Sequence, residues 1–142
     1  MLDTLIGHVA KIAGIETSTS REALGIIINA AERQGAPFAE AMYEKVPGSR
    51  TLAATMGAEV GAATDEIARL IEQTPGGRRH VTAMMILDLQ ARGLGHKMIG
   101  AILPAISDFA EQKIGLAGFS HLGDLLGTPT EIDDLMGAHV AA

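Results

Sequence analysis

Apolar residues recur every three or four positions along most of this chain, which is the spacing of one face of an α-helix. The clearest case is the N-terminal stretch, where apolar residues follow this pattern from Leu2 to Ala13 and Gly14 occupies the position of a C-terminal cap. No segment alternates between apolar and polar residues with a period of two, so β-strands are not expected. The pattern predicts an all-α protein.

Glycine and proline divide the pattern into short helical segments. Many of the 17 glycines fall where a helix should end, and no long polar linker separates the segments. Residues 1–142 are therefore predicted to form a single domain, a compact bundle of seven or eight short helices with 24–31 and 99–110 at its centre. Helices are predicted at residues 2–13, 24–31, 37–45, 50–73, 81–91, 99–110, 119–126 and 128–136.

Local signals refine these boundaries. Thr19 and Glu22 have the spacing of a capping box in front of the second helix. Ser49 is placed to cap the fourth helix. Pro104 lies inside the 99–110 pattern, where it predicts a kink or the start of a new helix, because proline lacks the N–H that an interior position needs.

A weak internal repeat relates the two halves of the chain. Gly14-Ile15 precedes an apolar helix in the same way as Gly93-Leu94, with an offset of 79 residues. The apolar residues that follow, from Leu24 and from Ile99, are offset by 75 residues, so a duplication would require an insertion or deletion. The alternative is that two apolar helices after a glycine cap look alike without common origin.

The same segments carry a family resemblance. The stretch from Gly14 to Gly48, with its Val46-Pro47-Gly48 break, resembles the VcgC/VcgE-type bacterial proteins of unknown function. The stretch from Leu89 to Ile106 resembles the same proteins and, more loosely, the YidB-like helical family. The resemblance covers about residues 14–126. It implies a bacterial, all-helical domain of unknown function and supplies no catalytic residue.

Composition narrows the classes of function. The chain has 142 residues, a net charge of −6 and 3% aromatic residues, which argues against a nucleic-acid surface. Without cysteine there is no disulfide, zinc ribbon or thiol nucleophile. Stretches without charge reach ten residues, too short for a transmembrane helix, so a soluble protein is expected. The N-terminus has no basic region before its apolar residues, which favours the cytoplasm, or the periplasm if an export signal has been removed.

Candidate chemistry is sparse. Arg78, Arg79 and His80 follow two glycines and precede an apolar helix, an arrangement that can hold a phosphate or carboxylate. The alternative is a solvated loop whose arginines pair with nearby acids. No two histidines stand three or four residues apart, so neither a metal site nor a cofactor is predicted. No nucleophile elbow is present, and the protein is predicted not to be an enzyme.

The sequence favours a function in interaction. Six methionines lie on apolar helical positions, which is typical of core filler and also of adaptable contact surfaces. The leading hypothesis is a non-enzymatic protein that associates with itself or another protein through a face of small residues, Ala54, Gly57, Ala58 and Gly61. A helix break at these glycines is the other interpretation. The alternative functions are a carrier or sensor of a small apolar ligand, lined by Met84, Leu87, Ile102 and Phe109, and an enzyme using the Arg78–His80 segment on an anionic substrate.

Overall fold

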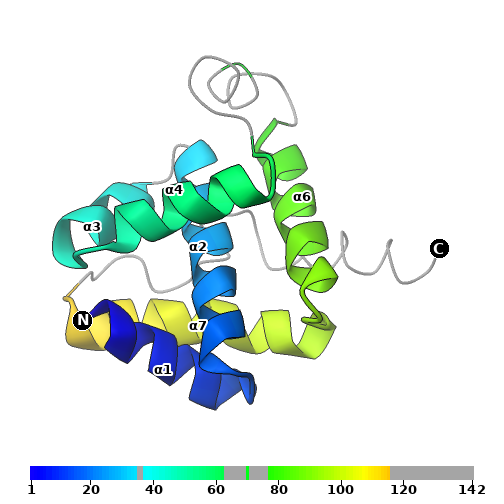
Figure 1. The fold of residues 1–142 in the computed structure, drawn as a ribbon. Coiled ribbons are helices and arrows are strands. Elements are labelled where there is room, and N and C mark those ends of the chain that lie inside the picture. Colours follow the sequence, from blue (N-terminus) through cyan, green and yellow to red (C-terminus); the bar gives the residue numbers. More distant parts are fainter. Residues whose placement is uncertain (35–36, 63–69, 71–76, 116–142) are drawn as a thin grey trace.

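The computed structural model describes residues 1–34, 37–62, 70 and 77–115, and in these ranges all regular structure is helical. The all-α prediction is confirmed. The helices predicted at 119–126 and 128–136 lie outside the described residues, so the predicted number of helices is not tested. The described helices are α1 (Leu2–Ala13), α2 (Thr17–Arg33), α3 (Pro37–Lys45), α4 (Ser49–Glu59), α6 (Gly77–Ala91) and α7 (His96–Lys113) (Figure 1).

Helix α2 is the centre of the fold. It packs against α1, α3, α4 and α6 (Figure 1). All residues from Ala23 to Ala31 are buried, so the middle of α2 is covered on every side. A helix that is apolar on all sides is expected in such a central position. The largest fully buried side chains of the core are Leu5, Leu24, Ile26, Ile27, Ile28, Phe38, Met42, Met85, Leu89, Leu94, Ile99 and Ile102.

Helix α7 continues through Pro104 as one helix of 18 residues. Proline at this position leaves the carbonyl of Gly100, one turn earlier, without its helical donor. Both Pro104 and Gly100 are exposed, so water can take the place of the missing N–H. The prediction that a new helix begins at Pro104 is therefore wrong.

The predicted capping box of the second helix is also wrong. Helix α2 begins at Thr17, so Thr19 lies inside its first turn and Glu16 occupies the N-cap position without a side-chain cap bond. Glu22 points elsewhere and pairs with Arg92, which lies 70 residues later in the chain. A tertiary ion pair has replaced the local bond that the spacing suggested.

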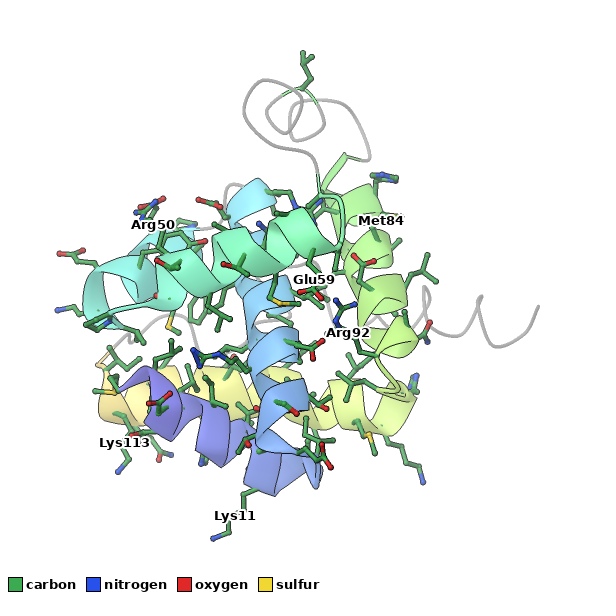
Figure 2. The ribbon with its side chains drawn as sticks, in the orientation of Figure 1. Lys11, Arg50, Glu59, Met84, Arg92 and Lys113 are labelled. Atoms are coloured by element: carbon green, nitrogen blue, oxygen red, sulfur yellow. The ribbon has the colours of Figure 1, made fainter. Side chains whose placement is uncertain are left out.

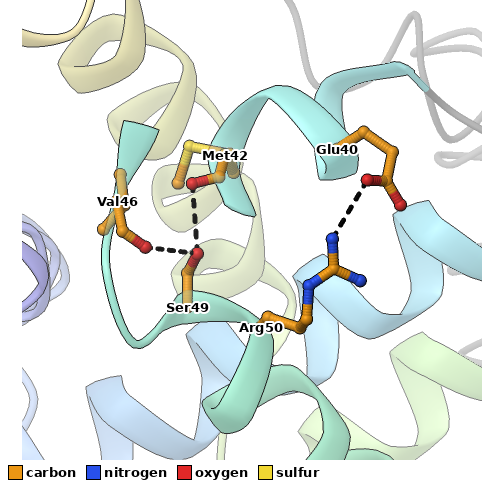
Figure 3. Close-up of polar contacts among 5 residues, drawn as sticks. All are labelled: Glu40, Met42, Val46, Ser49 and Arg50. Atoms are coloured by element: carbon orange, nitrogen blue, oxygen red, sulfur yellow. Dashed lines mark hydrogen bonds and ion pairs between the residues drawn. The ribbon is translucent and has the colours of Figure 1, made fainter. Parts of the chain in front are cut away.

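Ser49 caps a different helix from the one predicted. Helix α4 begins at Ser49 itself, and Gly48 in front of it has a left-handed conformation. The buried Ser49 hydroxyl lies 2.7 Å from the carbonyl oxygen of Val46 and 3.1 Å from that of Met42, both at the end of α3 (Figure 3). The Ser49 hydroxyl thus adds a side-chain donor to two carbonyls at the end of α3 that also accept backbone N–H groups from Val46 and Ser49.

The two turns behind the weak internal repeat have the same geometry. Gly14 and Gly93 both have positive φ, 68° and 85°. In each turn the next residue, Ile15 or Leu94, donates its N–H to the carbonyl five residues back, at 3.0 and 3.2 Å. This is the six-to-one bond of a Schellman motif, which explains the glycine at both positions.

The two helix pairs joined by these turns also pack in an equivalent way. Helix α1 packs on α7, and α2 packs on α6, so the first helix of each pair contacts the second helix of the other. The same offset of 79 residues holds in the helices that follow the turns, where it aligns Leu24 with Leu103, and both of these residues are buried. The offset of 75 residues suggested by the apolar pattern is not the one that the structure follows.

Candidate functional site

The small residues of α4 do not form one open face. Ala54 and Ala58 are exposed, whereas Gly57 is buried against α2. A Cβ atom at position 57 would overlap the side-chain amide of Asn29. Gly61 follows the helix with a φ of +71°, which ends it. The two interpretations of the glycines therefore apply to different residues: Gly57 allows a close helix contact within the chain, and Gly61 is a helix break.

This arrangement corrects the predicted self-association face. Gly57 is covered by α2 of the same chain and is not open to a second copy. Ala54 and Ala58 remain exposed one turn apart on the outer side of α4, but their methyl groups offer little apolar area to a partner.

The predicted lining of an apolar pocket is divided between the surface and the core. Met84 and Leu87 are 41% and 42% exposed, on the side of α6 that faces away from the core. Ile102 and Phe109 are buried on α7, with exposures of 0% and 4%. The four side chains therefore do not line one cavity, because the apolar residues of α6 lie on both the inner and the outer side of that helix.

The predicted anion segment lies within a helix. Helix α6 begins at Gly77, four residues earlier than predicted, so Arg78, Arg79 and His80 belong to its first turn and not to a loop before it. His80 is exposed. Anion binding at this segment remains a prediction.

The outer side of α6 carries an exposed apolar stripe, called here the α6 face. It consists of the exposed residues His80, Met84, Leu87 and Ala91, spaced so that they share one side of the helix. Met84 is labelled in Figure 2. None of these is an aspartate, glutamate, lysine or arginine. By contrast, exposed residues of the other described helices include Asp3 and Lys11 on α1, Arg21 and Glu32 on α2, Glu40 and Glu44 on α3, Arg50 and Glu59 on α4, and Lys97 and Asp108 on α7.

An ionic cluster fixes the position of α6 against its neighbours. Arg92, in the turn after α6, donates from Nε to Glu22 of α2 at 2.8 Å, and its Nη2 lies 3.5 Å from Glu59 of α4. Figure 2 shows Glu59 and Arg92 on facing sides of the space between α4 and α6. The Arg92 side chain is 20% exposed, so solvent weakens the 2.8 Å bond less than it would a surface pair. No spacing in the sequence points to this trio, because its members come from three separate segments.

Asp88 of α6 lies close enough to Arg33 and Arg92 to feel both of their charges. Partial burial raises the pKa of its carboxyl above the ordinary value, and the positive charges of Arg33 and Arg92 offset only part of that rise. Arg33 is occupied by a hydrogen bond from Nε to Asn29 Oδ1 at 2.9 Å, and burial lowers the pKa of its guanidinium. The structure therefore favours the neutral form of Asp88 relative to the unfolded chain.

We expect Asp88→Asn to raise the free energy of unfolding at pH 7. Because the folded-state pKa of Asp88 is raised, its ionisation destabilises the fold as the pH rises through that pKa, and asparagine removes this cost. The side chain is partly solvated, so the gain should be only a few tenths of a kcal/mol, roughly. Urea unfolding should show the gain at pH 7 and almost none below about pH 2.5, where the carboxyl is protonated in both states. A loss of stability at pH 7 would contradict the direction of the shift.

Tyr43 and Arg50 join α3 to α4. The Arg50 guanidinium lies 4.4 Å from the centre of the Tyr43 ring and 3.1 Å from Glu40 (Figure 3). Burial, followed by the negative charge of Glu32, raises the pKa of the Tyr43 hydroxyl far above its ordinary value. The phenol therefore stays protonated, which suits a structural contact and not a nucleophile.

The described residues offer neither a metal site nor a membrane-spanning helix. They contain no group of three or more histidine, aspartate or glutamate side chains placed to hold a metal ion. None of the described helices is long and apolar enough to cross a membrane. The chain matches no protein family, no curated protein and no solved structure.

Proposed function

We propose that the protein is a non-enzymatic interaction protein that associates with a second copy of itself through the α6 face. The observation that carries the proposal is the exposure of Met84 and Leu87, 41% and 42%, on a face without Asp, Glu, Lys or Arg. Large apolar side chains grouped on one exposed face are typical of contact surfaces. The resemblance to VcgC/VcgE-type and YidB-like proteins stays a prediction and contributes no residue to this proposal.

Charge favours the α6 face as the place where two copies meet. The net charge is −6, so two copies repel each other overall, and the repulsion is weakest when the contact itself carries no charge. In an antiparallel, two-fold contact the α6 face would pair Met84 of each copy with Leu87 of the other and would set no like charges opposite each other. His80 at one end would lie over Ala91 at the other, where the small side chain leaves space for the ring.

The expected association is weak. Full burial of a leucine or methionine contributes about 1.5–3 kcal/mol, so side chains already more than half covered contribute about 1 kcal/mol each. Four of them, two from each copy, give roughly 4 kcal/mol, which by itself corresponds to a dissociation constant of about 1 mM, and the remaining surface that the two helices cover has to offset the cost of association. We therefore expect a dimer that forms at high protein concentration and dissociates on dilution.

Sedimentation velocity on wild type and Leu87→Glu tests the proposal. Over about 10 µM to 1 mM protein, the wild-type sedimentation coefficient should rise with concentration towards that of a dimer. The Leu87→Glu variant should stay monomeric, because a dimer would bury two unpaired carboxylates.

Ala54→Glu is the matched control, since it places the same charge on the exposed side of α4. It should associate like wild type. A wild type that is monomeric at every concentration would refute the proposal, and loss of association in both variants would refute the α6 face as its location. Native mass spectrometry of the same sample addresses the alternative function, because a bound apolar ligand would appear as a discrete additional mass.

A further inference from the structure

The methionines of the described helices differ sharply in exposure. Met84 is 41% exposed, whereas its neighbour in the chain, Met85, is fully buried. Met42 and Met56 are buried as well, with exposures of 0% and 4%. Oxidation of a thioether requires access of the oxidant to sulfur, so the folded chain presents Met84 and protects its neighbour.

Met84 also has a distinctive position. It lies within the α6 face, one turn from Leu87, and the partly exposed Asp88 borders the face on its other side. Oxidation would place a strongly polar S–O group in the middle of this surface. A polar group buried in a contact without a hydrogen-bond partner lowers the stability of that contact.

We propose that Met84 is a site of oxidation by hydrogen peroxide, and that its sulfoxide weakens association through the α6 face. The sulfur lone pair attacks one peroxide oxygen, an S–O bond forms and the O–O bond breaks. Sulfur loses two electrons, and the second oxygen leaves as water with both protons, so the peroxide is reduced. The effect on association rests on the proposed function, whereas the faster oxidation of Met84 than of Met85 rests on their exposures alone. Because the dimer is weak, the monomer continually exposes Met84 to the oxidant.

The first test follows the site of oxidation in the full-length, folded chain. Timed treatment with hydrogen peroxide, digestion and fragment-ion mass spectrometry separate Met84 from Met85, which lie in the same peptide. Met84 should oxidise at least about tenfold faster than Met85, because only its sulfur is accessible in the folded state. Similar rates for the two adjacent residues would overturn the assignment. Both rates should become equal in the unfolded chain, in urea.

The second test follows association after the same treatment. Oxidised wild type should sediment as a monomer at concentrations where untreated wild type associates, and Met84→Leu should associate with and without peroxide. Leucine keeps the apolar character of position 84 and cannot be oxidised, so this variant controls for oxidation elsewhere, including the exposed Met1. Association that persists when Met84 is fully oxidised would overturn this inference alone. An untreated wild type that never associates would instead overturn the proposed function.

Discussion

A Gly25→Leu variant is expected to lose most or all of its folded stability. Helix α2 crosses α4 so closely at this position that even a Cβ atom would lie 2.5 Å from Met56 Cγ and 3.0 Å from the backbone oxygen of Leu52. The methionine can move, but the backbone oxygen is held by helix α4. A whole leucine side chain would therefore push the two helices apart. Overpacking by single groups costs about 1–3 kcal/mol, and a leucine adds several such groups against a total stability of about 5–15 kcal/mol.

A graded substitution makes this prediction measurable. Gly25→Ala should lower the free energy of unfolding by about 1–3 kcal/mol, since the clash with α4 exceeds the gain in helix propensity. Gly100→Ala is the matched control, because a Cβ atom at position 100 of α7 meets nothing within 4 Å. It should raise stability by up to about 1 kcal/mol. Urea unfolding gives the free energy of unfolding of both variants. Equal effects of the two alanine substitutions would contradict a close contact between α2 and α4.

The second large effect is expected from Ile27→Ala in the middle of α2. Ile27 is fully buried within the stretch of α2 that is covered on every side. Removing its side chain beyond Cβ leaves a cavity that several helices would have to move to fill. The expected loss is about 2–5 kcal/mol, as for other large-to-small changes in protein cores.

Ile12→Ala provides the comparison for this substitution. Ile12 is on α1 and is 54% exposed, so the same atoms are removed from a surface position. Its effect on the free energy of unfolding should stay within about 0.5 kcal/mol. Thermal and urea unfolding of the two variants should therefore separate clearly. Similar losses of stability in the two variants would contradict the complete burial of Ile27 in the middle of α2.

Most of the fold could be predicted from the sequence because helix formation depends on neighbouring residues. The spacing of apolar residues located every described helix, and the glycines at positions 14 and 93 marked turns that the structure shows to be Schellman motifs. The boundaries were less accurate. Helix α2 begins seven residues before the predicted start at Leu24, since its polar first turns carry no apolar stripe.

The candidate site was less predictable than the fold. The apolar pattern of α6 is nearly continuous, so it did not show which side of the helix faces the core. Met84 and Leu87 were assigned to an interior pocket, yet they are the exposed residues of that pattern. The partners of Arg92 were not foreseen either, because Glu22 and Glu59 come from distant segments.

The sequence by itself determined the helical class, the positions of the turns and the apolar character of α2 and α6. These follow from backbone conformation and from local spacing, which act over a few residues. Only the tertiary structure decided that Gly57 packs on Asn29, that the Ser49 hydroxyl bonds to carbonyls at the end of α3, and that the other described helices leave one side of α6 exposed. Each of these depends on which helices become neighbours, and that is set by the packing of side chains far apart in the chain.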